Sequence, residues 1–197
     1  MTVSVRPRPI GLLLAALVLL VVAGAGALWL TSSASPGIGG PFKLVNGDSK
    51  PITDQDFRGR YMLVYFGYTF CPDVCPTTLN QVAEAMDRLG TNANRVQPIF
   101  ISVDPKRDTP AVVKQFVGAF SPRIVGLTGT PEQIAAVAKE YRVYYAVRQN
   151  GDNPNDYTVD HSSILYLMDG KGRFVAPIRA DESGVDMAAD IARHLPS

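Results

Sequence analysis

Cysteine and histidine are scarce in this chain, which contains only two of each among its 197 residues. Two cysteines cannot support a scaffold built on many disulfides, so the fold must rest on a hydrophobic core. An excess of one charge is also missing, because 19 lysines and arginines face 18 aspartates and glutamates. This balance gives no electrostatic reason to expect nucleic acid as a partner. The length excludes a large multidomain enzyme and allows one domain with a modest appendage.

One long segment, residues 10–30, carries no charge and is predominantly apolar. A helix of this length rises about 31 Å, which matches a hydrocarbon core about 30 Å thick. We therefore predict a single transmembrane helix. The alternative is a cleavable signal peptide, because Ala25, Gly26 and Ala27 resemble a cleavage site, although its apolar region is normally shorter.

The charges that flank this segment predict its orientation. Arg6 and Arg8 precede it and the next positive charge is Lys43, so residues 1–9 should form a cytoplasmic tail. Residues 31–40 are rich in serine, glycine and proline and predict a flexible linker. Residues 41–197 should then fold on the periplasmic side of the inner membrane, in an oxidising compartment.

Strand and helix patterns alternate beyond the linker. The expected strands cover residues 42–45, 51–53, 61–66, 96–103, 124–127, 144–147, 164–168 and 174–178. Apolar residues at helical spacing predict one helix that ends at Gly90 and three that begin near Pro110, Pro131 and Ser183. Asp108 or Thr109 is expected to cap the second of these helices. The order predicts an α/β fold with a mixed sheet, helices on both faces and an N-terminal hairpin.

Both cysteines lie between the apolar strand at 61–66 and the helix that follows it. Sites form at the carboxyl ends of parallel strands, and a helix N-terminus there favours thiolate over thiol. On a first helical turn, Cys71 and Cys75 would lie one turn apart on one face. Such a pair is compatible with a shared metal ion, a reactive dithiol or a structural disulfide, and its placement favours the first two.

The two histidines differ in their surroundings. His194 falls near the end of the last expected helix, where it complements the helix dipole and needs no further role. His161 follows a polar loop, residues 150–158, and precedes the strand at 164–168, so we expect it at a strand mouth. Two thiolates and one imidazole are too few for a closed zinc site. They suit a low-coordinate soft ion, and Cu(I) is the metal that we favour.

Several neighbouring residues are expected to have supporting roles. Asp73 and Asp160 adjoin the candidate ligands and can orient His161, tune the thiolates or contact a partner. Asp104 is expected to end a strand. Four aromatic residues should form core and a hydrophobic wall that shields the site: Tyr65, Phe66, Tyr68 and Phe70.

Three segments together resemble the Sco (SenC-type) family of membrane-anchored copper chaperones for cytochrome c oxidase assembly. They are residues 65–79 (YFGYTFCPDVCPTTL), 102–110 (SVDPKRDTP) and 159–167 (VDHSSILYL). The resemblance implies a thioredoxin-like fold and copper bound by Cys71, Cys75 and His161. It also implies that Cys71 and Cys75 form a redox-active disulfide and that copper passes to the binuclear copper site of oxidase subunit II, the expected partner.

Delivery of copper, with Cu(I) favoured and Cu(II) possible, needs no catalytic turnover and hence no catalytic residue. An upstream copper donor and a thiol reductant for the cysteine pair are possible further partners. A second hypothesis is a thiol-disulfide reductase for subunit II or other exported proteins, which needs both cysteines but not His161. A third is a thiol peroxidase, in which one cysteine attacks peroxide and the other resolves the sulfenic acid.

Overall fold

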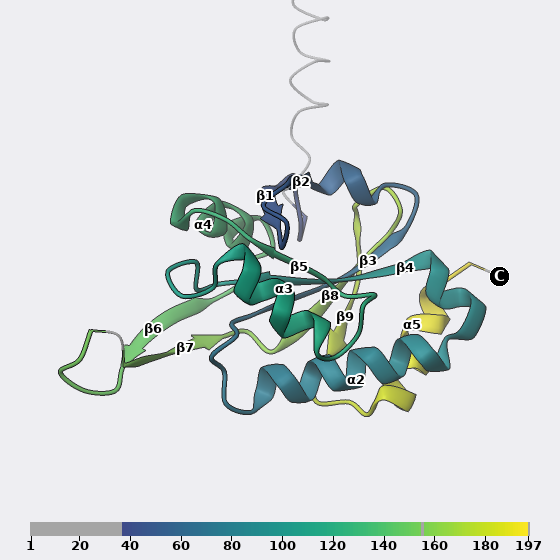
Figure 1. The fold of residues 1–197 in the computed structure, drawn as a ribbon. Helices are drawn as coiled ribbons and strands as arrows, with labels where there is room; N and C mark the ends of the chain where they lie inside the picture. The colour runs from purple at the N-terminus through teal and green to yellow at the C-terminus, as the bar shows by residue number, and fades with distance from the viewer. Residues whose placement is uncertain (1–36, 155, 197) are drawn as a thin grey trace, which may run out of the picture. The chain divides into compact units, whose positions relative to one another are not determined.

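A seven-stranded sheet forms the centre of the domain, with the strand order β2-β1-β5-β4-β3-β8-β9 (Figure 1). The computed structural model describes residues 37–154 and 156–196. The cytoplasmic tail, the anchor and most of the linker, which are predicted within residues 1–36, lie outside the described residues. In the described part, no helix is long and apolar enough to cross a bilayer.

The sheet is mixed, as predicted. The strands are β1 (Lys43–Asn46), β2 (Pro51–Thr53), β3 (Tyr61–Gly67), β4 (Val96–Ser102), β5 (Val125–Thr128), β8 (Ile164–Met168) and β9 (Phe174–Arg179). β3, β4 and β5 run parallel, whereas β1, β2, β8 and β9 pair antiparallel with their neighbours. The carboxyl ends of β3 and β4 therefore meet at one edge of the sheet, where sites of α/β proteins form.

Helices cover both faces of the sheet (Figure 1). They are α2 (Val74–Arg88), α3 (Pro110–Gly118), α4 (Pro131–Glu140) and α5 (Gly184–His194), with short 3₁₀ turns at η1 (Asp54–Phe57) and η2 (Gly90–Arg95). α2, α3 and α5 lie on one face and α4 on the other. The side chains of Thr109, Thr130 and Ser183 cap α3, α4 and α5. Each accepts a backbone N–H that the helix itself leaves unpaired.

β3 is buried on both faces, as its continuous apolar run predicts. Tyr65 points to the side of α2 and packs against Phe100 with ring centroids 6.2 Å apart. Phe66 points to the other side, where it contacts Tyr141 and Tyr166. A strand fixed from both faces gives the segment that follows it a rigid starting point.

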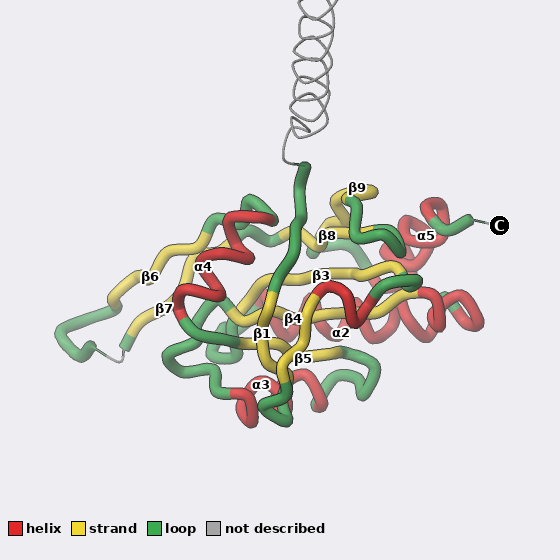
Figure 2. Tube along the Cα trace, turned by 90° about the horizontal axis from the view of Figure 1, so that it is seen from above, coloured by secondary structure: helices red, strands yellow, loops and turns green. Residues whose placement is uncertain are grey.

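Two strands lie outside the main sheet. β6 (Tyr145–Gln149) and β7 (Tyr157–His161) pair only with each other and form an arm that extends away from the sheet (Figure 2). A strand at 144–147 was predicted, but β7 was not, and His161 was expected in a loop. His161 is instead the last residue of β7.

The first described residues enter the domain beside α4 and β8. The backbone N–H of Gly39 donates to the carbonyl of Glu140 at 2.9 Å. Gly39 has φ +91°, and a Cβ there would lie 2.3 Å from Cε of Met168, so this approach requires glycine. The chain therefore enters at the Met168 end of β8.

Candidate metal centre

The two cysteines occupy the connection between β3 and α2. Cys75 lies in the first turn of α2, but Cys71 lies in the preceding loop, which corrects the expectation that both share one helical turn. The cause is Pro72, because the residue before a proline is biased away from helical conformation. The backbone N–H of Cys75 nevertheless points to Cys71 Sγ at 3.4 Å, so the helix N-terminus still faces this sulfur.

Gly67 makes room for Cys75 at the end of β3. A Cβ on Gly67 would lie 2.8 Å from Cys75 Sγ and 2.9 Å from the ring of Phe100. Cys75 is completely buried, whereas Cys71 is partly exposed. The absence of a side chain at Gly67 is therefore what lets the inner sulfur approach the strand.

His161 meets the cysteines from the end of the β6–β7 arm. Its Nε2 lies 3.3 Å from Cys75 Sγ, and its Nδ1 lies 3.2 Å from the carbonyl oxygen of Ser162. The contact of Nδ1 with this carbonyl orients the ring so that Nε2 faces the sulfur. The rings of Tyr65 and Tyr68 pack edge-on against the imidazole, with centroids 6.1 and 6.0 Å away.

The ligand atoms of Cys71, Cys75 and His161 lie within 4.8 Å of one another, and neither cysteine forms a disulfide. Two sulfurs and one nitrogen at this separation can converge on one ion. The set is soft and of low coordination number, which suits Cu(I) chemistry better than a closed tetrahedral zinc site.

The two thiols have opposite pKa shifts. A hydrogen bond from the Cys75 thiol lowers the pKa of Cys71 to about 3, and His161 and the backbone N–H groups of Cys75 and Asp73 add to this effect. The interaction with Cys71 and burial raise the pKa of Cys75. The metal-free centre is thus a thiolate at Cys71 beside a thiol at Cys75, and an ion that takes both sulfurs displaces the Cys75 proton.

The side chains of Asp73 and Asp160 do not reach the ligands. The Asp73 carboxylate accepts from the Thr77 hydroxyl at 3.5 Å, and the residue contributes its backbone N–H to Cys71. Asp160 is exposed and pairs with Arg148 at 2.8 Å. The carbonyl of Ser162, and not the Asp160 carboxylate, therefore orients the His161 ring.

Asp108 has a role that the sequence did not reveal. Thr109 caps α3, while the completely buried Asp108 accepts from Thr69 N at 2.9 Å, Thr69 Oγ1 at 2.6 Å and Ser102 Oγ at 2.6 Å. Burial raises the pKa of its carboxyl group. Asp108 thus fixes the loop that carries Cys71. A polar segment directly after the buried strand β4, beside the end of β3, was the available signal.

Asp104 also does more than end a strand. It is buried, and its Oδ1 accepts from the hydroxyl of Tyr157, on β7, at 2.8 Å. Its Oδ2 accepts from Arg107. These contacts attach the arm that carries His161 to the end of the main sheet.

The remaining expectations concern places away from the centre. His194 lies at the end of α5, 3.7 Å from Asp190, as its helix-terminal position predicts.

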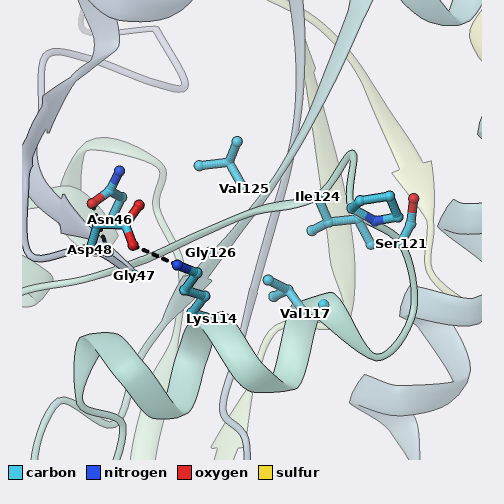
Figure 3. Close-up of a pocket in the computed structure, with 11 residues that line it drawn as sticks. Asn46, Gly47, Asp48, Lys114, Val117, Ser121, Ile124, Val125 and Gly126 are labelled. Carbon is cyan, nitrogen blue, oxygen red and sulfur yellow. Dashed lines mark hydrogen bonds and ion pairs between the residues drawn. The ribbon is translucent and has the colours of Figure 1, made fainter.

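A cavity of about 370 Å³ lies between α3, β5 and the β1–β2 turn (Figure 3). Lys114 points across its rim to Asp48 at 2.5 Å, so the two charges neutralise each other. No cysteine or histidine is among the described residues that line this cavity, and it offers no second metal centre.

Fold and site together define a thioredoxin-like domain with a Cys-Cys-His centre at the carboxyl ends of its parallel strands. The chain belongs to the SCO1/SenC family, whose model matches residues 31–196. SenC of Rhodobacter capsulatus is 50% identical over 145 residues, which are 74% of this chain and 65% of that protein. The mitochondrial SCO1 homolog 1 of Arabidopsis thaliana is 46% identical over 145 residues, 73% of this chain and 43% of that protein.

A solved structure of Bradyrhizobium japonicum ScoI with copper bound has a TM-score of 0.74 and 46% sequence identity. The match covers 81% of this chain and all of that chain. This chain spans less than two thirds of the length of the two relatives from Rhodobacter capsulatus and Arabidopsis thaliana.

Proposed function

We propose that this protein binds one Cu(I) ion through Cys71, Cys75 and His161 and delivers it to the binuclear copper site of cytochrome c oxidase subunit II. The observation that carries the proposal is the convergence of the three ligand atoms within 4.8 Å. Membership of the SCO1/SenC family and the copper-bound ScoI structure support copper as the cargo.

Binding is favoured by charges that the fold already supplies. Cys71 is poised as a thiolate, and the N-terminus of α2 stabilises negative charge at this sulfur. Cu(I) then displaces the proton of Cys75. The Nε2 lone pair of His161, held by the Nδ1–Ser162 hydrogen bond, completes a three-coordinate set.

Release is favoured by the unequal exposure of the ligands. Cys71 is partly exposed, whereas Cys75 is completely buried. An incoming cysteine or histidine of subunit II therefore reaches the ion beside Cys71 and replaces the ligands one at a time. A centre with three ligands permits such exchange more readily than a closed four-coordinate cage.

The binding step is tested by competitive titration of Cu(I) against a colorimetric chelator, under reducing conditions. The wild-type protein is expected to bind one ion. His161→Ala is expected to bind it at least about 100-fold more weakly, because loss of a ligand costs more than the 10- to 100-fold that is typical of a residue that only orients one. His194→Ala is the matched control, because it removes the other histidine, and its affinity should remain at the wild-type value. Unchanged affinity in His161→Ala would contradict the assigned ligand set.

The delivery step is tested by mixing the copper-loaded protein with the metal-free soluble domain of subunit II. After the two proteins are separated, copper is expected in the acceptor domain when the donor is the wild type and not when it is Cys71→Ser. Stable retention of copper by the wild type in the presence of this acceptor would argue against delivery.

A thiol-disulfide reductase for subunit II or other exported proteins is the second candidate. The observation that favours it is the pairing of an accessible thiolate at Cys71 with a buried thiol at Cys75, the arrangement of an attacking and a resolving cysteine. Reduction of insulin disulfides separates the two functions. His161→Ala should retain this activity if reduction is the function, whereas copper delivery requires the imidazole.

The family and the apolar run at residues 10–30 support a membrane-anchored protein with its domain in the periplasm. In this arrangement the copper centre and subunit II lie on the same side of the inner membrane. The copper donor and the reductant of the cysteine pair would act in that compartment as well.

A further inference from the structure

Arg107 lies in the connection between β4 and α3, next to both halves of the metal centre. Its side chain is only 16% exposed, which is unusual for an arginine. Apart from Asp104, in its own connection, the residues that it contacts belong to two separate segments, the one that leads to Cys71 and the strand that ends at His161.

On the side of the arm, Arg107 contacts β7 in three ways. The guanidinium carbon lies 3.6 Å from the ring centroid of Tyr157, and Nη1 donates to the carbonyl oxygen of Tyr157 at 2.9 Å. Nε donates to Asp104, whose other oxygen accepts from the Tyr157 hydroxyl. Arg107 thus holds the ring and the carbonyl of Tyr157 directly, and the hydroxyl of Tyr157 through the carboxylate of Asp104.

On the side of the cysteines, the guanidinium carbon lies 4.7 Å from the ring centroid of Phe70 and 5.7 Å from that of Tyr68. Phe70 directly precedes Cys71 and is 58% exposed, so few other contacts restrain its ring. Tyr68 packs edge-on against His161. Arg107 therefore stacks between the aromatic residues of the cysteine loop and the tyrosine of the arm.

The charge and the hydrogen bonding of Arg107 also indicate that the aromatic rings hold its side chain in place. Asp104 balances its charge, but Nη2 is buried and has no hydrogen-bond partner among the described residues. A buried N–H without an acceptor is destabilising, because it has lost its hydrogen bonds to water. The faces of aromatic rings attract the guanidinium and offset part of this cost. An ion pair with Asp104 alone would not require this placement.

We infer that Arg107 is a positioning residue of the metal centre, which joins the cysteine loop to the β6–β7 arm and thereby brings His161 to Cys71 and Cys75. The inference rests on the proposed function in that it takes Cu(I) as the bound ion. Lysine cannot replace Arg107, because its ammonium lacks the planar face that stacks between rings and the rigid fork that donates to Asp104 and to the Tyr157 carbonyl together.

The test is a double-mutant cycle with Cu(I) affinity as the measurement. Arg107→Met is expected to weaken binding about 10- to 100-fold in the protein that contains His161. In the His161→Ala background the same change should alter affinity by less than about twofold, because the ligand that Arg107 positions is already missing. Equal losses in the two backgrounds, or no loss in the first, would overturn the inference.

Two further variants separate positioning from folding. Arg107→Lys keeps the charge beside Asp104, so it can replace Arg107→Met in the test if the methionine variant does not fold. Its Cu(I) affinity is expected to fall by most of the amount that Arg107→Met loses. Arg88→Met makes the same substitution as Arg107→Met at an exposed arginine of α2 that pairs with Glu84. It should bind Cu(I) as the wild type does.

A second measurement uses the metal-free protein and does not depend on copper. In Arg107→Lys, backbone ¹⁵N relaxation should give the amides of β7 order parameters below about 0.85, the value that is typical of a rigid backbone. In Arg88→Met these order parameters should stay at that value. A rigid β7 in Arg107→Lys contradicts the inference. Failure of the wild-type protein to bind Cu(I) at all contradicts the proposed function, and the relaxation result then still decides whether Arg107 holds the arm.

Discussion

Cys71 and Cys75 differ in accessibility and in charge, although only three residues separate them. The inner sulfur contacts Gly67 and lies 3.8 Å from the hydroxyl of Tyr65, whereas the outer one faces the first N–H groups of α2. The difference arises because one cysteine is inside the helix and the other precedes it. Residues of the same type therefore have separate roles in one centre.

We predict that iodoacetamide modifies Cys71 of the reduced, metal-free protein much faster than Cys75. The sulfur of Cys71 is accessible, and its pKa is lowered to about 3. Its thiolate is therefore retained as the pH falls from 8 to 5, whereas an ordinary thiol with a pKa of about 8.5 loses reactivity about tenfold per pH unit. Peptide mass spectrometry over this pH range measures both rates. Equal modification of the two cysteines would contradict the assigned burial.

Asp108→Ala is expected to lower the free energy of unfolding by about 3 kcal/mol. The substitution leaves three donors without an acceptor, from Thr69 and Ser102, and each buried unpaired donor costs about 1–3 kcal/mol before relaxation. Urea unfolding at neutral pH measures the loss. Asp48→Ala, which removes an exposed ion pair with Lys114, is the control and should change the free energy of unfolding little, because solvent screens such a pair. Similar losses in the two variants would mean that Asp108 has no special structural role.

At the scale of single elements, the sequence predicted the main sheet and helices because local patterns determine them. Apolar runs predicted β3 and β4, and Thr109, Thr130 and Ser183 marked helix starts through their cap positions. β7 was missed because its five residues directly follow a polar loop, although its two inward residues, Tyr157 and Val159, alternate with outward ones and belong to the hydrophobic core. This alternation is the local pattern that could have revealed the strand.

The candidate ligands could be predicted because only four residues in the chain are cysteine or histidine. The geometry of these ligands could not be predicted. The position of Cys71 outside α2 follows from Pro72, because helical spacing alone does not include the restriction that a proline places on the residue before it. The roles of Asp104, Arg107 and Asp108 depend on contacts across the sheet edge, and a sequence alone does not reveal which partners a buried polar side chain meets.

The close approach of β3 and α2 makes a further prediction. Gly67→Ala should lower the free energy of unfolding by about 1–3 kcal/mol, because the new methyl group overlaps Cys75 Sγ and Phe100. It should also weaken Cu(I) binding, since Cys75 must move. Thermal unfolding and copper titration measure the two effects.

Gly118→Ala is the matched control for this prediction. Nothing lies within 4 Å of a Cβ at Gly118, which ends α3, so the change should be neutral or stabilising by up to about 1 kcal/mol. Equal behaviour of the two alanine variants would show that the space beside Gly67 is not limiting.

At the scale of the whole molecule, the sequence correctly predicted an α/β fold of the thioredoxin-like type. The alternation of strands and helices restricts the number of possible topologies, and the motif resemblance selected one of them. The separate arm of β6 and β7 is the main difference, because the predicted strands were assigned to one sheet.

The anchor prediction is tested on the full chain in a bacterial host. The protein should remain in the membrane fraction after a carbonate wash, and deletion of residues 10–30 should remove it from that fraction. Intact mass measurement distinguishes the signal-peptide alternative, which predicts a mature protein that begins near Leu28, directly after Ala27. Recovery of such a shortened chain would overturn the anchor.

The position of Gly39 has a consequence for docking. Gly39 approaches Met168 at one end of β8, whereas the residues between His161 and Ile164 lead into its other end. The described domain therefore begins at the end of β8 that is remote from its sulfur atoms. A partner that docks on the cysteines and His161 meets other residues than those at which the domain begins.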